Sequence, residues 1–118
     1  MATGSATMTL PEIVEAVKRW NLPLVEITGG EPLLQSATPR LASLFFQAGF
    51  TVLVETNGSL PIDVLPEGVI RIMDIKCPDS GMHEKLDGRN LEVLTPRDEV
   101  KFVLASRADY QWALGLLH

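Results

Sequence analysis

The sequence predicts an α/β fold in which flanking helices cover a parallel β-sheet. Short apolar segments typical of buried strands alternate with amphipathic segments typical of helices. Glycine, asparagine or proline follows most of the strand segments, as expected where the chain turns. With 118 residues, 46% of them hydrophobic, the chain is long enough to bury a core of its own.

Three segments space their apolar residues at the helical period. The segment 10–20 follows Thr9 and Glu12, which match the capping-box pattern. The segment 39–48 follows Thr38, the expected cap, and ends at Gly49. The last helix is expected over 106–117, opened by the capping pattern of Ser106 and Asp109.

Four apolar segments predict the strands, and they are 22–28, 50–55, 69–75 and 100–104. The crossover 55–69 is too short and too rich in proline for a full helix. The polar stretch 77–96 is long enough to predict a functional loop. We expect residues 1–8 to be a disordered or tag-like segment and residues 9–118 to form one domain.

Composition argues against several classes of partner. The net charge is −5 and the basic residues are scattered, which argues against nucleic-acid binding. No apolar run approaches the roughly 20 residues of a membrane-spanning helix. The first ten residues do not resemble a secretory signal, so a cytoplasmic location is expected.

Cysteine and histidine are too few for a metal site built within these residues. The single cysteine, Cys77, excludes an internal disulfide and any site made of several thiolates, and we expect it to be buried. His83 and His118 do not match a metal-ligand spacing. The aromatic residues beside helical apolar positions, which are expected in the core, are Trp20, Tyr110 and Trp112.

Polar residues stand where the first three predicted strands end. Because ligands of parallel α/β sheets bind at the carboxyl ends of the strands, we expect these clusters to form one site. After the first strand, Gly29 and Gly30 allow close approach to the backbone, and Glu31 offers a carboxylate to a cationic group. A plain turn with a solvated glutamate explains this cluster equally well.

The other two clusters also have simpler explanations. Glu55 and Asn57 offer hydrogen-bonding groups to sugar hydroxyls, although Asn-Gly is in itself a strong turn signal. Asp74 and Lys76 are two residues apart and therefore on one side of the strand, where they would face a ligand or form a salt bridge.

Together the clusters resemble a known family. Residues 29–32, Gly-Gly-Glu-Pro, resemble the GGEP motif of radical S-adenosylmethionine enzymes. The match continues from Met8 onward through residues 33–35, 55–59, 74–78, 80–81 and 98–103, with Arg107, Asp109, Tyr110 and Trp112. It resembles the middle portion of 7-carboxy-7-deazaguanine synthase. This resemblance implies a partial (β/α) barrel, truncated at both ends, with S-adenosylmethionine lying across its strand tips.

The resemblance also implies a function. The family is a carbon–nitrogen lyase that contracts the ring of 6-carboxy-5,6,7,8-tetrahydropterin, with loss of ammonia, on the route to queuosine and related 7-deazapurines. The radical derived from the cofactor abstracts a substrate hydrogen and is regenerated. By motif, Gly29, Gly30 and Glu31 would bind the methionyl end of the cofactor. Adenosyl or substrate groups would contact Glu55, Asn57 and Lys76.

The chain departs from the family in its metal ligands. The three-cysteine motif that binds the [4Fe–4S] cluster has no counterpart in this sequence, and the ligand of the family's Mg²⁺ is missing with it. We therefore expect this chain alone not to cleave S-adenosylmethionine. An open sheet edge would also allow pairing with a second copy in a homodimer.

Two alternatives stay open at this point. The GGEP motif also fits a fragment of a glycyl-radical activating enzyme, and the chain could instead be a non-catalytic remnant that binds S-adenosylmethionine. Residues 74–78 and 98–103 favour the synthase over the activating enzyme.

Overall fold

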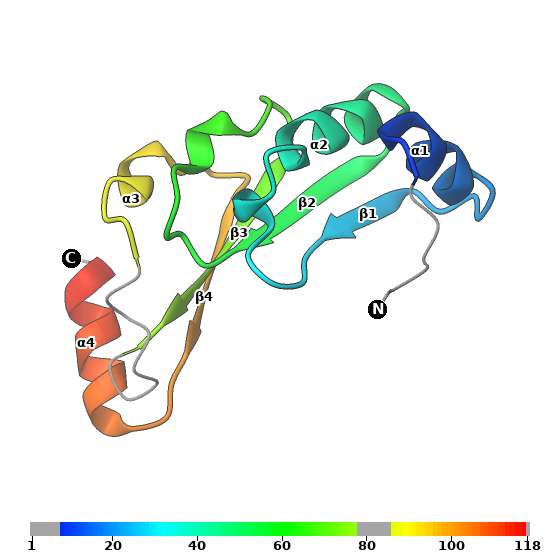
Figure 1. Cartoon of the computed structure of the whole chain (residues 1–118). Helices are drawn as coiled ribbons and strands as arrows, with labels where there is room; N and C mark the ends of the chain where they lie inside the picture. Colours follow the sequence, from blue (N-terminus) through cyan, green and yellow to red (C-terminus); the bar gives the residue numbers. More distant parts are fainter. Residues whose placement is uncertain (1–7, 78–85, 118) are drawn as a thin grey trace.

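The computed structural model describes residues 8–77 and 86–117. Its four strands form one parallel sheet whose spatial order, β1-β2-β3-β4, is also the order along the chain (Figure 1). The predicted α/β class and the parallel sheet are therefore confirmed. The strands are β1 (Leu24–Ile27), β2 (Thr51–Thr56), β3 (Ile70–Lys76) and β4 (Glu99–Val103).

The three predicted helices are present, as α1 (Leu10–Lys18), α2 (Thr38–Gln47) and α4 (Arg107–Leu117). The capping box of α1 is formed: Thr9 N donates to Glu12 Oε1 at 2.8 Å and Glu12 N donates to Thr9 Oγ1 at 3.2 Å. Figure 1 shows α4 at the opposite end of the molecule from α1.

The expected cap of α2 is wrong. Ala37 occupies the N-cap position without a side-chain hydrogen bond, and Thr38 already belongs to the helix. The buried hydroxyl of Thr38 donates instead to the carbonyl oxygen of Pro32 at 2.6 Å. It therefore joins α2 to the turn that follows β1.

In the described residues, two crossovers contain only short helical segments. Between β2 and β3 there is only one turn of 3₁₀-helix, η2 (Ile62–Val64), which confirms the predicted lack of a full helix. Between β3 and β4 lies the short helix α3 (Asn90–Val93), inside the stretch expected to be a loop. His83 and His118 lie outside the described residues.

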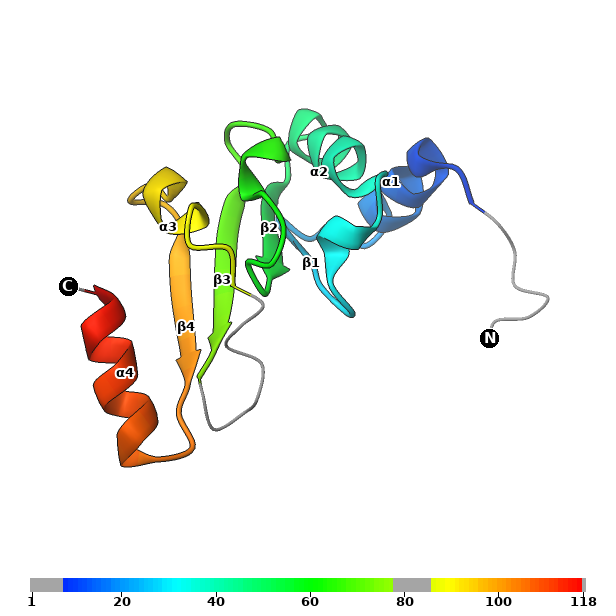
Figure 2. The same cartoon turned by 60° about the vertical axis from the view of Figure 1, so that its left-hand side comes forward.

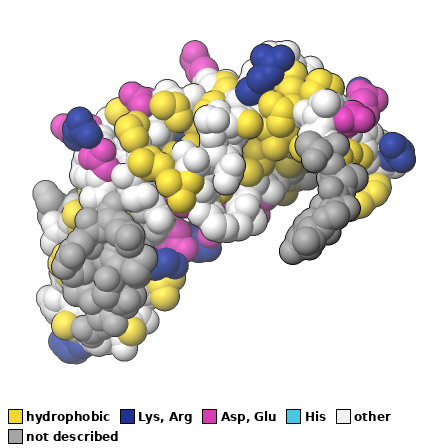
Figure 3. Space-filling model, viewed as in Figure 1, with side chains coloured by type: hydrophobic (Ala, Val, Ile, Leu, Met, Phe, Trp, Pro, Cys, Tyr) yellow, Lys and Arg dark blue, Asp and Glu magenta, His cyan; other side chains and the backbone are white. Residues whose placement is uncertain are grey.

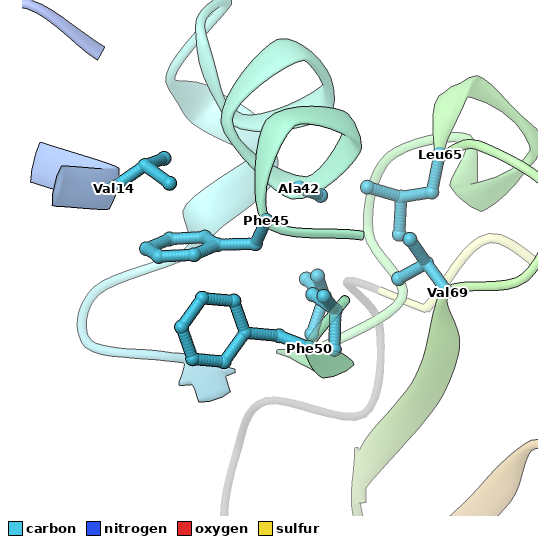
Figure 4. Packing of buried hydrophobic residues seen from close by; sticks show 8 residues of the cluster. Val14, Ala42, Phe45, Phe50, Leu65 and Val69 are labelled. Atoms are coloured by element: carbon cyan, nitrogen blue, oxygen red, sulfur yellow. The ribbon is translucent and has the colours of Figure 1, made fainter. Parts of the chain in front are cut away.

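The main hydrophobic core lies between the two N-terminal helices and the sheet (Figure 4). The rings of Phe45 and Phe50 meet edge to face, with centroids 5.5 Å apart. Val52 and Val54 of β2 are fully buried beneath the helices. Burying these side chains fixes which face of β2 points toward the helices, because a strand alternates its side chains.

The register gives the sheet a second, charged face. Glu55 aligns with Ile72, and Asp74 aligns with Lys101, so their side chains share the face opposite Val52 and Val54. In β1 only Val25 and Ile27 pack on the core, whereas Leu24 is 51% exposed. The expectation of a continuously buried first strand is therefore wrong, because only one face of β1 is covered.

Two of the three aromatic residues expected in the core are exposed. Trp20 is 72% exposed because α1 ends before it, at Lys18, and Tyr110 is 50% exposed on α4. Exposed apolar side chains also lie among charged ones on the face seen in Figure 3. None of the helices in the described ranges combines the length and apolar character needed to cross a bilayer.

Candidate functional site

The carboxyl ends of β1, β2 and β3 meet around one cavity of about 270 Å³. Figure 2 shows the arrowheads of β3 and β4 pointing the same way, as the parallel register requires. The wall of the cavity contains all six residues predicted to contact the cofactor or substrate, together with Asp74 and two neighbours: Thr28, Gly29, Gly30, Glu31, Glu55, Thr56, Asn57, Asp74 and Lys76.

The tip of β1 leaves the backbone accessible. Gly29 has a φ of +119°, a conformation that residues with a side chain rarely adopt. At both Gly29 and Gly30 a Cβ atom would have no heavy atom within 4 Å. The space beside the two peptides is therefore open, and a ligand can reach their amide and carbonyl groups.

Glu31 is held by the protein itself. Its Oε1 accepts from Asn57 N at 2.7 Å, and its Oε2 accepts from Leu33 N at 2.9 Å and from Thr56 Oγ1 at 2.7 Å. An ionised carboxylate has about four acceptor positions, so about one remains for a cationic group. The expected carboxylate is present in the cavity wall, but most of its acceptor capacity serves the fold.

The tip of β2 brings charge to the second face of the sheet. Glu55 Oε1 accepts from Lys101 Nζ at 3.3 Å. A side-chain hydrogen bond with Glu55 is the main cause that raises the pKa of Glu26, helped by burial and by the negative charge of Glu55. The Glu55 hydrogen bond and charge likewise raise the pKa of Lys101.

Asn57 forms the turn that the Asn-Gly pair predicts. Its Oδ1 accepts from Ser59 N at 2.9 Å, the hydrogen bond of an Asx turn. Its backbone amide binds Glu31, and within the described residues no acceptor for its side-chain NH₂ group is present. Turn formation and a contact with a ligand are therefore compatible at this residue.

The tip of β3 carries the predicted salt bridge. Lys76 Nζ donates to Asp74 Oδ2 at 2.9 Å. Asp74 Oδ1 is buried and accepts no hydrogen bond from any described residue. A buried polar atom of this kind normally has a partner, so this oxygen is an exception among the described residues.

Cys77, which follows β3, is buried as predicted. Burial raises the pKa of its thiol, and the negative charge of Asp109 raises it further. The thiol is therefore not activated as a thiolate.

A cluster-binding site does not fit the residues that are described. They contain one thiol, and no three of their His, Cys, Asp or Glu side chains are placed to hold a metal ion together. The [4Fe–4S] cluster of a radical S-adenosylmethionine enzyme is bound by several cysteine thiolates.

Sequence reasoning missed two polar residues, Thr56 in the cavity wall and Asn90 outside it. Thr56 was part of the second cluster but was given no role, although its hydroxyl binds Glu31. Asn90 is buried, donates to the carbonyls of Gly58 and Leu60, and accepts from Ile62 N. No local pattern predicts contacts across about thirty residues, so only the fold identifies Asn90.

A larger cavity, of about 700 Å³, lies at the other end of the sheet, before β3 and β4. The guanidinium of Arg71, one of its lining residues, is already engaged by Asp98 and by the carbonyls of Ile62 and Val93. The cavity at the strand tips is smaller, but its wall contains the open glycine backbone and the charged residues Glu31, Glu55, Asp74 and Lys76.

Comparison with known proteins identifies relatives that share one name. The chain is 49% identical over 92 residues to a 7-carboxy-7-deazaguanine synthase of Koribacter versatilis, a match covering 76% of this chain and 40% of the relative. It is 45% identical to that of Chlorobaculum tepidum, covering 90% and 50%, respectively. It is 40% identical to that of Methanospirillum hungatei, a match covering 93% of this chain and 47% of the relative.

The chain thus spans about half the length of the curated relatives it matches. None of these three is named as a glycyl-radical activating enzyme, so that alternative receives no support. No family model matches the sequence. No solved structure matches it significantly.

Proposed function

This chain is related in sequence to a stretch of the 7-carboxy-7-deazaguanine synthases, and we propose that its strand-tip cavity binds S-adenosylmethionine. The observation that supports this most is the convergence of six residues, from three separate strand ends, on one cavity. Those six are Gly29, Gly30, Glu31, Glu55, Asn57 and Lys76.

The chemistry of the wall suggests how the cofactor would lie. The open backbone at Gly29 and Gly30, with the remaining acceptor position of Glu31, suits a methionyl amino group. Asn57, whose side-chain NH₂ has no acceptor among the described residues, and Glu55 suit ribose hydroxyls. The cavity of about 270 Å³ is slightly smaller than most ligand pockets, so we expect it to enclose only part of the molecule.

For the whole enzyme we propose the activity of the family. S-adenosylmethionine, when bound, supplies radical chemistry that contracts the ring of a pterin-like substrate with loss of ammonia, toward queuosine and related 7-deazapurines. The residues of this chain would bind and orient the cofactor and exclude water from it. The enzyme would be a carbon–nitrogen lyase that also needs a [4Fe–4S] cluster and Mg²⁺.

The ligands of that cluster are not supplied by these 118 residues, which contain one cysteine. We therefore expect the chain alone to bind the cofactor without cleaving it. Anaerobic reconstitution with iron and sulfide tests this. Formation of 5′-deoxyadenosine by the reconstituted chain would show that the expectation is wrong.

Calorimetric titration with S-adenosylmethionine tests the site itself. Gly30→Val is the informative variant, because position 30 has room for a side chain and no positive φ, so the new methyl groups would occupy the cavity rather than disturb the fold. Gly88→Val, at an equally open position outside the cavity wall, is the control.

We expect Gly30→Val to weaken binding by about tenfold or more, the effect of losing roughly 1.4 kcal/mol, and Gly88→Val to bind like the wild type. No binding by the wild type, or equal affinities of the two variants, would contradict the proposed site.

Pairing with a second copy through the sheet edge also stays a proposal. The outer strands are β1 and β4, and an exposed strand edge can pair with another chain. Sedimentation equilibrium would detect such a homodimer. The cytoplasmic location expected from the sequence stays a prediction as well.

A further inference from the structure

We propose that Thr56 is a positioning residue for the candidate site, because its hydroxyl holds the Glu31 carboxylate and so fixes the glycine turn against the tip of β2. The inference deepens the proposed function, on which it rests. It assigns Thr56 no direct contact with a ligand. Its effect passes through Glu31.

The hydroxyl of Thr56 is buried and its hydrogen bonds have a defined direction. Thr56 is the last residue of β2 and is 2% exposed. Its Oγ1 accepts from Gly58 N at 3.2 Å and lies 2.7 Å from Glu31 Oε2. A hydroxyl has one proton, and a carboxylate can only accept, so Thr56 must donate to Glu31.

The Glu31 carboxylate joins segments that are distant in sequence. Thr56 and Asn57, at the tip of β2, supply two of its donors, and Leu33 of η1 (Pro32–Leu34) supplies the third. The link to Thr56 spans 25 residues. Hydrogen bonds to an ionised group are shorter and stronger than neutral ones, so this link should hold the two tips rigidly.

The link matters for binding because a ligand in the cavity would contact both tips at once. The open backbone at Gly29 and Gly30 forms one wall, and Glu55 and Asn57 form another. If the two walls moved independently, binding would have to order them first. A site fixed before the ligand arrives avoids that entropic penalty.

Three variants isolate the hydroxyl. Thr56→Val keeps the shape of the side chain and removes the hydroxyl, both as donor to Glu31 and as acceptor from Gly58 N, whereas Thr56→Ser keeps the hydroxyl. Thr51→Val makes the same change at an exposed position at the start of the same strand and is the matched control.

Amide hydrogen exchange and calorimetry with S-adenosylmethionine are measured on all three and on the wild type. In Thr56→Val we expect exchange at the Leu33 and Asn57 amides to rise about tenfold, with no change at Val52 and Val54, because the charge-assisted hydrogen bond to Glu31 and the one from Gly58 N are both lost locally. Its affinity should fall about tenfold, whereas Thr56→Ser and Thr51→Val should resemble the wild type.

Each other outcome overturns the inference. Unchanged exchange at Leu33 and Asn57 would show that the hydroxyl does not hold the link. A rise at Val52 and Val54 as well would show a general loss of stability, and failure of serine to restore the wild-type behaviour would exclude the hydroxyl. Local loosening with unchanged affinity would show that the link does not position the ligand.

A failure of the proposed function can be distinguished from a failure of the link between Thr56 and Glu31. If the wild type did not bind S-adenosylmethionine, the cofactor assignment and the affinity part of the inference would both be lost, while the exchange pattern would still decide whether Thr56 holds Glu31. If Thr56→Val did not fold, Glu31→Gln would replace it, because the change turns one acceptor oxygen into a donor. The same local rise is then expected, and its absence would overturn the link.

Discussion

Gly58, just after the tip of β2, is a residue at which a single methyl group should be costly. It has a φ of +73°, and a Cβ atom there would lie 2.7 Å from Met73 Sδ and 2.9 Å from Leu86 Cδ1. We expect Gly58→Ala to lower the free energy of unfolding by about 1–3 kcal/mol, through backbone strain and overpacking. Urea denaturation followed by circular dichroism measures this.

Gly88→Ala is the control for Gly58→Ala, because position 88 has no atoms within 4 Å of a Cβ and no positive φ. It should change stability by less than about 0.5 kcal/mol. Equal effects of the two substitutions would contradict the packing described around Gly58.

Asp98 should make stability depend on pH. Burial by itself raises the pKa of Asp98, but the hydrogen bonds from Arg71 and Thr95 outweigh it, so the pKa is lowered overall. A carboxyl group whose pKa is lower in the folded state stabilises the fold above its unfolded pKa, near 4, and loses this contribution as the pH falls further. We therefore expect the wild type to lose stability as the pH falls below about 4.

Asp98→Asn should remove this part of the pH dependence and destabilise the protein by about 3 kcal/mol at pH 7, because Arg71 loses its buried partner. Urea denaturation at several pH values measures both effects. Asp63→Asn, at an exposed position on η2, should keep the wild-type dependence of the free energy of unfolding on pH. If the stability of Asp98→Asn depended on pH as that of the wild type does, Asp98 would not be the group responsible.

For individual residues, the sequence predicted which ones line the cavity but not which hydrogen bonds they form. Gly29, Gly30 and Glu31 follow a strand, and parallel topology places strand ends together, so their convergence could be predicted. The donors to Glu31 could not, because Thr56 and Asn57 reach it only once β1 and β2 are paired.

Among the secondary-structure elements, the loop after β2 depends on a short helix far along the chain. The side chain of Asn90 at the start of α3 donates to the carbonyls of Gly58 and Leu60 and accepts from Ile62 N. The helix itself is only four residues long, so its own hydrogen bonds cannot stabilise it much. Loop and helix therefore stabilise each other through this side chain.

We expect Asn90→Ala to lower the free energy of unfolding by about 2–4 kcal/mol, because it leaves buried backbone groups without partners. Denaturant unfolding measures the loss, and Glu92→Ala, at an exposed position on the same helix, should be nearly neutral. If both substitutions were neutral, α3 would not anchor the loop.

Elements with a strong local signal were predicted well. The capping box of α1 and the Ser106–Asp109 pattern of α4 are both formed. The errors arise where tertiary contacts compete with local ones: the hydroxyl of Thr38 binds the carbonyl of Pro32 rather than capping α2. The short helix α3 was missed because four residues give no periodic signal.

For the molecule as a whole, the parallel sheet followed from apolar strands alternating with helices, and the structure confirms it. The sequence did not predict that one face of the sheet is apolar and the other charged, because a short apolar segment does not reveal whether one or both of its faces are covered. The exposed Leu24 and the salt bridge from Lys101 to Glu55 both depend on strand register, which emerges only from the assembled sheet.

The central claim is that three strand tips form one site for S-adenosylmethionine. Backbone amide chemical shifts recorded during a titration with S-adenosylmethionine test it most directly. The account predicts that the amides of Gly29, Gly30, Asn57 and Lys76 shift together with one dissociation constant, while that of Gly68, beside the larger cavity, stays unchanged. Shifts confined to the larger cavity, or none at the strand tips, would contradict it.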